Sequence, residues 1–271
     1  MSRAELHVGC AMWTHRGWPF SGLSGYSGWC DAVEGNTTFY ATPARDTVES
    51  WAAQTDPSFR FVVKLPKSVT HERRLASADI AGFLNAIEPL GPRLHALWIQ
   101  LPGSFTPADT DVLARFLTAL PAGHRYAVEV RHAGFFTRPG PLERVLATVG
   151  AEWIPFDSTA FFASPPTSDA ERDAWTKKPR MPRRTVALTD RPIVRYLGRD
   201  SVAATVEGWQ PWLDVVAGWL REGRSPTVFI HTPDNVDAPP LARRFHDQVR
   251  ARVPTLPPLP PIPEPPQPTL F

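Results

Sequence analysis

Cysteine and long apolar runs are both scarce in this chain. Only two cysteines occur among 271 residues, Cys10 and Cys30, and they do not form the spacing of a structural zinc site. No apolar run approaches the roughly 18 residues that a membrane span needs. We therefore expect two buried thiols, no disulfide framework, no contact with a membrane and a cytoplasmic location.

Several catalytic and nucleotide-binding motifs are also missing. The chain has no G-x-S-x-G elbow, and neither cysteine lies beside a histidine in a known catalytic signature. It has no G-x-G-x-x-G or G-x-x-x-x-G-K loop, so no nucleotide cofactor is indicated. The formal net charge is only +2, so any argument for nucleic-acid binding has to come from local clusters of charge.

What the chain does have is a series of short apolar runs that end in charged or amide residues. In chain order they span Leu6–Trp13, Glu34–Tyr40, Phe59–Leu65, Leu94–Leu101, Tyr126–Arg131, Trp153–Asp157, Ile193–Gly198 and Thr227–His231. Parallel strands that are buried on both faces need such continuous apolar sequence. The polar residues at the ends of the runs predict one polar rim at the carboxyl end of a parallel sheet.

Helical patterns alternate with these runs. Thr106, followed by Pro107 and Asp109, is typical of a helix start, and apolar residues then recur on one face. Further helices are predicted at 80–87, 141–149, 209–222 and 241–252. This alternation, in a chain close to the roughly 250 residues of a typical barrel, predicts an α/β fold, the (β/α)8 TIM-type barrel, over residues 1–252. A proline-rich tail over residues 253–271 follows.

Five stretches of sequence also resemble a known family. They are Gly9–Trp13, Glu34–Tyr40, Phe61–Lys64 with Thr70 and His71, Gln100–Pro102, and Glu129–His132. In this order they resemble the domain of unknown function 72 family, often called YecE-like, over about residues 6 to 250. The resemblance implies a TIM-type barrel, and it implies no reaction because the activity of the family is not established.

The chain departs from the family pattern at two late strands. Many members read R-x-H-G where this chain has Arg195-Tyr196-Leu197-Gly198, so no histidine role is carried over to that segment. His231 and Asn235 stand in place of an amide-rich turn and are taken as its counterparts.

The polar residues at the run ends are the candidate site. We predict catalytic roles, as acid, base or metal ligand, for Glu34, Glu129, Asp157, His71 and His231. We predict substrate binding by Asn36, Lys64, Gln100, Arg131, His132, Arg195 and Asn235. Residues two apart on a strand share a face, so Glu34 with Asn36 and Glu129 with Arg131 should each project together.

Three alternatives remain open for these rim residues. Glu129 and Arg131 could neutralise one another as a purely structural pair. Glu34 and Glu129 could be the carboxylate pair of a glycosidase, which their separation would decide. A divalent metal is the third option: three acids beside three cations argue against a bare carboxylate cluster, although histidines could add neutral ligands.

Two further features suggest a phosphate-bearing ligand and a DNA-associated partner. The segment Lys177–Arg184 carries five cations in eight residues and would attract phosphate if it lay at the rim, although charge runs are usually solvated loops. The segment Pro254–Pro266 should favour extended polyproline II and act as a stiff spacer. After it, Gln267, Leu270 and Phe271 match the Q-x-x-L-F peptide by which bacterial replication and repair proteins dock on the DNA sliding clamp. Packing of this peptide on its own barrel is the alternative.

Together these patterns predict an enzyme that acts at the barrel mouth on a phosphate-bearing or nucleic-acid-derived substrate. The predicted chemistry is acid/base or metal-assisted hydrolysis, with a tether to the sliding clamp. One alternative is a small-molecule isomerase or lyase on a hydroxylated substrate. Another is a non-catalytic adaptor of the clamp, in which the rim residues form only an ion-pair network.

Overall fold

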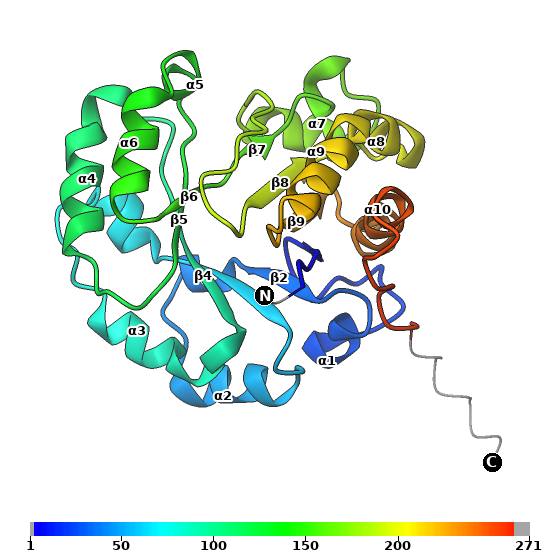
Figure 1. Cartoon of the computed structure of the whole chain (residues 1–271), viewed down its shortest axis with the longest axis horizontal. Helices are drawn as coiled ribbons and strands as arrows, with labels where there is room; N and C mark the ends of the chain where they lie inside the picture. The colour runs from blue at the N-terminus through cyan, green and yellow to red at the C-terminus, as the bar shows by residue number, and fades with distance from the viewer. Residues whose placement is uncertain (1–2, 263–271) are drawn as a thin grey trace.

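The computed structural model describes residues 3–262 of the chain, so the clamp-like peptide lies outside the described residues. Nine parallel strands form one sheet in the order β6-β5-β4-β3-β2-β1-β9-β8-β7 (Figure 1). The strands are β1 (His7–Cys10), β2 (Ala32–Gly35), β3 (Arg60–Lys64), β4 (Leu94–Gln100), β5 (Tyr126–Glu129), β6 (Glu152–Trp153), β7 (Phe156–Asp157), β8 (Ile193–Leu197) and β9 (Thr227–His231). The predicted parallel α/β fold is therefore confirmed.

The sheet is curled, because its two edge strands are consecutive along the chain. Only Ile154 and Pro155 separate β6 from β7. The Ile154 amide donates to the carbonyl of Val128 on β5 (2.8 Å), and the Arg195 amide on β8 donates to the carbonyl of Pro155 (3.0 Å). The two connecting residues thus continue the pairing on both sides of the break.

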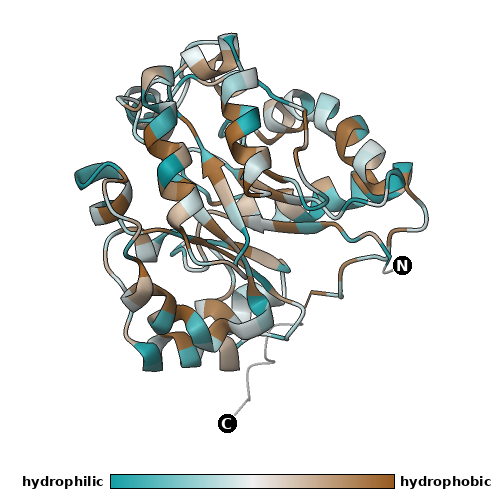
Figure 2. Ribbon diagram, turned by 60° about the vertical axis from the view of Figure 1, so that its left-hand side comes forward, coloured by the Kyte–Doolittle hydropathy of each residue, from teal (hydrophilic) through white to brown (hydrophobic). Residues whose placement is uncertain are grey.

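Helices cover the outer face of this sheet (Figure 1). They are α1 (Gly22–Ser27), α2 (Arg45–Ala53), α3 (Ala81–Ile87), α4 (Thr110–Ala119), α5 (Gly134–Thr137), α6 (Gly140–Thr148), α7 (Asp169–Lys177), α8 (Val202–Gly208), α9 (Gln210–Arg221) and α10 (Ala238–Arg252). Figure 2 shows hydrophobic and hydrophilic residues alternating along these helices. That pattern is expected when one stripe of a helix packs on a sheet and the other meets water. No described helix combines the length and the apolar composition required to cross a bilayer.

The predicted helix start at Thr106 is confirmed. The Thr106 hydroxyl accepts a hydrogen bond from the Ala108 amide (3.3 Å), and the Asp109 carboxylate accepts from the Thr106 amide (2.7 Å). This reciprocal capping satisfies amides that the first helical turn leaves without partners. A short 3-10 turn, Pro107–Asp109, then leads into α4.

The second predicted run is displaced by two residues at its start. Strand β2 begins at Ala32, and the residues Thr37–Phe39, which were predicted to be extended, form a 3-10 turn. The Thr38 hydroxyl is buried and donates to the carbonyl of Lys64 (2.6 Å). This bond ties the turn to the end of β3, so Phe39 lies beside that strand rather than along β2.

A small apolar plug fills the inside of the curled sheet. It consists of Ala32, Val62, Ala96, Trp98, Ala127, Ile154, Ile193 and Phe229, all of which are buried. The larger core lies between the sheet and the helices. Since alternate residues of a strand share a face, the residues two positions beyond these plug residues point inward as well. Five such residues are Glu34, Lys64, Glu129, Arg195 and His231, which therefore lie above the plug at the carboxyl ends of the strands.

The predicted tail does not begin as a free spacer. Leu256 is buried in the main core, and Leu259 packs against it. Arg243 of α10 donates to the carbonyl of Pro260 (2.6 Å). The spacer prediction is therefore wrong for residues up to 260, because the leucines between the prolines bury apolar surface on the barrel.

Candidate functional site

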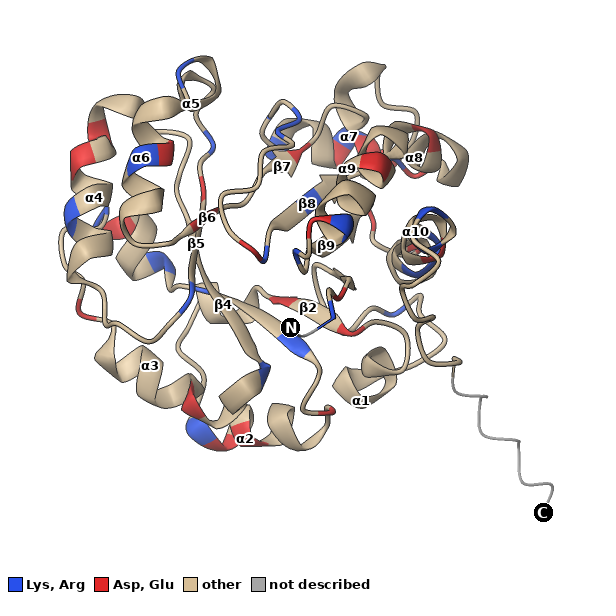
Figure 3. Ribbon diagram, viewed as in Figure 1, with Lys and Arg blue, Asp and Glu red and all other residues tan. Residues whose placement is uncertain are grey.

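A cavity of about 670 Å³ opens at the carboxyl ends of the strands. It is lined by nine of the twelve predicted catalytic and substrate-binding residues: Glu34, Asn36, Lys64, His71, Gln100, Arg131, Arg195, His231 and Asn235. Figure 3 shows an acidic residue on β2 and a basic residue on β8, the strands that carry Glu34 and Arg195. The rim that the sequence indicated is therefore one concave site for these nine residues.

Arg195 is the centre of a buried ion-pair network below this cavity. Its Nε and Nη2 donate to the two carboxylate oxygens of Glu34 (2.6 and 3.0 Å), and its Nη1 donates to Glu129 (2.8 Å). The Nε of Arg131 donates to the other oxygen of Glu129 (2.7 Å). We call Glu34, Glu129, Arg131 and Arg195 the mouth network. Two acids and two cations within it balance one another.

Glu34 has no oxygen left over for a substrate. Besides Arg195, His231 Nε2 lies 2.7 Å from one oxygen and Asn36 Nδ2 lies 3.0 Å from the other. Burial lowers the pKa of His231, whereas the Glu34 carboxylate opposes this effect. Because a carboxylate only accepts, Nε2 of His231 is the donor in this contact. Burial alone would raise the pKa of Glu34, but the attraction of Arg195 and His231 outweighs it and holds the pKa well below its usual range. Glu34 is therefore a fixed carboxylate that orients its neighbours.

Aromatic rings hold the Arg195 guanidinium in place. The guanidinium carbon lies 4.3 Å from the centroid of Trp98 and 4.8 Å from that of Phe156. Burial opposes the charge of Arg195, but the two glutamates outweigh it and raise the pKa further. A cation held between rings and carboxylates has little freedom to move toward a ligand. Arg195 therefore organises the floor of the cavity.

Lys64 differs from the arginines because no described carboxylate pairs with it. Its Nζ lies 3.9 Å from the centroid of Phe39 and 4.8 Å from that of Trp98. Burial lowers the pKa of Lys64 to about 7, and repulsion from Arg195 and Arg131 acts in the same direction, whereas Glu129 opposes it. Near neutral pH this amine is thus partly unprotonated, which distinguishes it from an ordinary surface lysine.

Other polar groups around the cavity also lack a protein partner. The Oε1 of Gln100 and the Oδ1 of Asn235 are buried without a hydrogen bond to any described residue. His71 lies in a π-helical turn, Ser68–Glu72, after β3, and burial together with Lys64 lowers its pKa to about 4. It is therefore a neutral imidazole at neutral pH. Orphaned amide oxygens beside a neutral imidazole are typical of a ligand site.

Three predicted residues do not line the cavity. Glu129 is fully buried beneath it within the mouth network. The Nδ1 of His132 accepts from the Gly134 amide (3.1 Å) outside the cavity lining. Asp157 accepts from Trp212 Nε1 (2.7 Å) and Arg183 Nε (2.9 Å).

The pleat of β7 explains the position of Asp157. The preceding residue, Phe156, contacts the inward-facing Arg195, so Asp157 points to the opposite face, toward α9. A carboxylate that is bonded on that side of the sheet is not available to a ligand in the cavity.

Sequence reasoning missed some of the cavity lining. Lys178 belongs to the cation run and was not assigned to the site, yet it lines the cavity, where burial lowers its pKa. Lys67 and Phe39 line it as well. No spacing rule could have placed Lys178, because it reaches the cavity from the long connection after β7. The only available signal was the local density of charge.

The described residues offer no metal-binding set of the predicted kind. Among residues 3–262, no group of three or more histidine, cysteine, aspartate or glutamate side chains is arranged to hold a metal ion. Cys10 and Cys30 are both buried as free thiols. The carboxylates of the mouth network are occupied by arginines instead.

Comparison with known proteins gives a consistent assignment. The family model described as protein of unknown function DUF72 matches residues 7–267. The UPF0759 protein YecE of Escherichia coli, from strains O157:H7 and K12, is 35% identical over 259 residues, which cover 93% of this chain and 95% of that protein. A DUF72 family protein of Enterococcus faecalis V583 superimposes with a TM-score of 0.69 at 17% identity, covering 93% of this chain and 98% of that one. A DUF72 family protein of Thermotoga maritima MSB8 gives a TM-score of 0.66 at 21% identity, covering 92% and 99%. These structural likenesses concern the fold alone, whereas the family model and the YecE relatives show that this chain belongs to the DUF72 family of proteins of unknown function.

Proposed function

We propose that this protein is an enzyme that binds a small phosphate-bearing substrate in the cavity at the carboxyl ends of its strands. The observation that carries the proposal is the charge of the lining. Lys64, Lys67, Lys178, Arg131 and Arg195 line the cavity, whereas Glu34 is the single acid there among the described residues and is fully bonded to protein groups. Such a lining attracts an anion into a partly desolvated cleft.

The fold supports a site at this end. We infer that β6 and β7 are the two halves of one strand, so that the nine strands occupy the eight positions of a TIM-type barrel. The amide bonds of Ile154 and Arg195 across the break support this inference. In such barrels the substrate binds at the carboxyl ends of the strands.

The size of the cavity favours a small substrate. A volume of about 670 Å³ is in the range that accommodates a metabolite or a single nucleotide. A nucleic-acid-derived ligand in this cavity would therefore be a nucleotide or a single extruded base. The proposed tether to the sliding clamp rests on Gln267, Leu270 and Phe271 alone and is independent of this cavity.

The bonding of the carboxylates favours lyase or isomerase chemistry over hydrolysis. A general acid must hold a proton near neutral pH, and the pKa values of Glu34 and Glu129 are held down by their arginine partners despite the burial that opposes this. Lys64, with a pKa near 7, is the group best suited to exchange a proton. The substrate is accordingly a small anionic compound with a carbonyl or hydroxyl group.

The non-catalytic alternative accounts for only part of the site. The mouth network is closed by internal ion pairs, as an adaptor would require. The side-chain oxygens of Gln100 and Asn235 are nevertheless buried at an open cavity without a described partner, and no described carboxylate pairs with Lys64. Groups left unpaired in a cavity favour a ligand.

Ligand-dependent melting tests the proposal. Inorganic phosphate and ribose 5-phosphate should raise the melting temperature, whereas ribose should not. Lys178→Gln should weaken phosphate binding about tenfold, which corresponds to ~1.4 kcal/mol for one lost charged contact. Lys177→Gln is the matched control, because Lys177 pairs with Asp173 (2.5 Å) and does not line the cavity. A melting temperature of the wild type that does not rise at any phosphate concentration would refute anion binding, and an equal rise in Lys178→Gln would remove Lys178 from the site.

A further inference from the structure

We propose that Lys64 is a covalent nucleophile that forms an imine with an aldehyde or ketone carrying a phosphate group. The phosphate part of this inference rests on the proposed function above, whereas the role of the amine stands on its own geometry. Imine formation needs an amine that is reachable, oriented and not fixed in an ion pair.

The position of Lys64 meets these requirements. It is the last residue of β3, and its side chain points inward above Val62. The residue is only 7% exposed, yet it forms part of the cavity wall. Phe39 and Trp98 cover two sides of it. Their ring faces attract a cation, but the burial of the amine outweighs this attraction and disfavours the ammonium form.

Two nearby cations have free donors for the phosphate. Arg131 uses its Nε on Glu129, and neither of its Nη atoms has a hydrogen-bond partner among residues 3–262. Lys178 likewise has no ion pair within that part of the chain. A guanidinium with two free terminal donors matches two oxygens of a phosphate. Because these cations line the same cavity as Lys64, they can hold the anionic end of a substrate while its carbonyl meets the amine.

The step is balanced without any other reactant. The lone pair of the Lys64 nitrogen attacks the carbonyl carbon, the new C–N bond forms, and the carbonyl oxygen receives the proton that the nitrogen loses. The C–O bond of this carbinolamine then breaks, and the oxygen leaves as water with the second proton of the amine. The sum is amine plus carbonyl giving imine plus water.

Gln100 is placed to assist this step. Its amide oxygen is buried at the cavity without a described partner, so it can accept a hydrogen bond from the carbinolamine hydroxyl. His71, which is neutral at neutral pH, lines the same cavity and can carry a proton between the nitrogen and the oxygen. Once protonated, the imine withdraws electrons from the neighbouring carbon, which is the chemistry of lyases and isomerases.

Reductive trapping with pyridoxal 5′-phosphate tests the inference on the full chain. This aldehyde carries a phosphate, and borohydride converts its imine into a stable secondary amine that peptide mapping locates. Lys67 is an internal control, because it lines the same cavity, its side chain is 52% exposed and it pairs with Glu72. At pH 7.5 we expect Lys64 to be modified at least tenfold faster than Lys67. Lys64→Met should lose that modification, while Lys177→Met, a variant outside the cavity, should keep it. Modification of Lys67 at an equal or faster rate overturns the proposal.

A second arm separates this inference from anion binding. Pyridoxal, which lacks the phosphate, should modify Lys64 at least tenfold more slowly than pyridoxal 5′-phosphate. Equal rates at Lys64 with both aldehydes would support the nucleophile and overturn the phosphate site. Protection of the fold by phosphate without preferential modification of Lys64 would support the phosphate site and overturn the nucleophile.

Discussion

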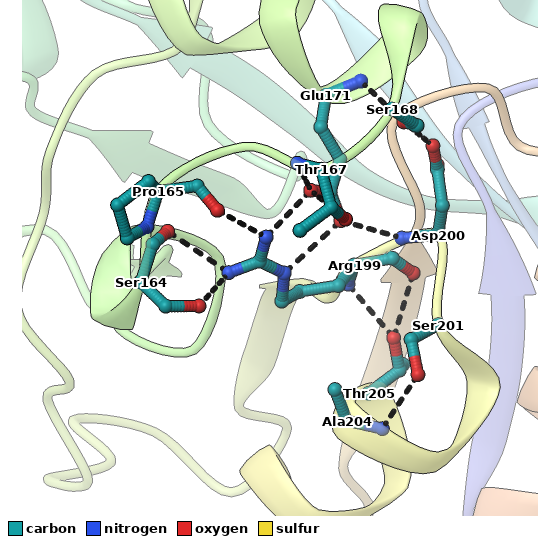
Figure 4. A network of polar contacts seen from close by, with 10 residues as sticks. All are labelled: Ser164, Pro165, Thr167, Ser168, Glu171, Arg199, Asp200, Ser201, Ala204 and Thr205. Carbon is teal, nitrogen blue, oxygen red and sulfur yellow. Dashed lines mark hydrogen bonds and ion pairs between the residues drawn. The ribbon is translucent and has the colours of Figure 1, made fainter.

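Two arginines only four residues apart form buried networks of different kinds. Arg195 belongs to the mouth network, and Arg199 forms the network shown in Figure 4. Both side chains are 7% exposed. Arg199 donates through Nε and Nη2 to the two oxygens of Glu171 (3.0 and 2.5 Å). It also donates to the carbonyls of Ser164 (2.9 Å) and Pro165 (2.8 Å).

The partners of Glu171 complete the second network. Its carboxylate also accepts from the amides of Thr167 (2.8 Å) and Asp200 (3.1 Å). Arg199 and Glu171 are therefore surrounded by protein groups, and neither lines the 670 Å³ cavity. A buried ion pair therefore does not by itself indicate a ligand-binding site. Each network has a neighbouring oxygen that is buried without a described partner, Gln100 Oε1 at the mouth and Asp200 Oδ1 beside Arg199. What distinguishes the mouth network is that Gln100 and Lys64 line the cavity, whereas Asp200 does not.

Removing Arg195 should have the largest effect on stability. Arg195→Met leaves Glu34 and Glu129 buried with too little positive charge, and we expect a loss of more than about 5 kcal/mol, because breaking one buried pair already costs 3–5 kcal/mol. Without Arg195 their pKa values should rise above those of the unfolded chain, so the variant loses stability as pH rises and should melt higher at pH 5 than at pH 7. Urea unfolding at both pH values measures this.

A compensating variant checks the cause of that loss. Adding Glu34→Gln and Glu129→Gln to Arg195→Met removes the uncompensated charges and should restore part of the stability. A loss below 2 kcal/mol in the single variant would mean that water or neighbouring lysines replace Arg195, and the mouth network would then not be a rigid floor.

Removing Arg199 should cost less and should leave the cavity unchanged. Arg199→Met isolates one buried carboxylate, Glu171, so a loss of about 3–5 kcal/mol is expected. Phosphate binding should stay within twofold of the wild type, since Arg199 does not line the cavity. Calorimetric titration with phosphate measures it. A loss of phosphate affinity as large as that expected for Lys178→Gln would show that the two networks are coupled. The contrast between them would then not hold.

At neutral pH and below, replacing Lys64 should stabilise the folded protein, whereas most replacements of buried residues destabilise it. The folded pKa of Lys64, about 7, lies below the ordinary value of about 10.4, so the unfolded chain binds more protons between these values and the wild type gains stability as pH rises. Relative to Lys64→Met, we expect a gain of about 2 kcal/mol between pH 7 and pH 9, measured by urea unfolding. Lys67→Met is the control. If the difference in unfolding free energy between the wild type and Lys64→Met does not change between pH 7 and pH 9, Lys64 is fully charged at neutral pH.

Replacements at the end of the chain should have the smallest effect on stability. A peptide of residues 262–271 should bind a bacterial sliding clamp at micromolar strength, and Leu270→Ala with Phe271→Ala should abolish that binding without shifting the melting temperature of the full chain. Leu256→Ala is the contrast, because Leu256 is buried and its truncation should cost about 2–5 kcal/mol. A peptide without clamp affinity would remove the argument for a partner on DNA.

Nine of the twelve predicted residues meet at one cavity because strand pleating is regular. Glu34, Lys64 and Arg195 lie at the carboxyl ends of buried strands. Each follows by two residues an apolar residue that points inward (Ala32, Val62 and Ile193), so each points inward as well. Asp157 escaped this rule, because the break between β6 and β7 places Phe156 inward, and sequence alone does not reveal which face a short strand presents. Lys178 escaped because a long connection carries it back to the cavity.

The span of the mouth network along the chain has a consequence for synthesis. Glu34 meets Arg195 only after 161 further residues and His231 after 197. The amino-terminal strands therefore emerge from the ribosome with an acid that has no counter-ion, and they cannot bury it until β8 and β9 follow. Contacts between such distant residues form slowly, since long loops must close first. Nascent chains that stop before β8 should thus remain open and depend on chaperones, and the cavity should form as one of the last events of folding.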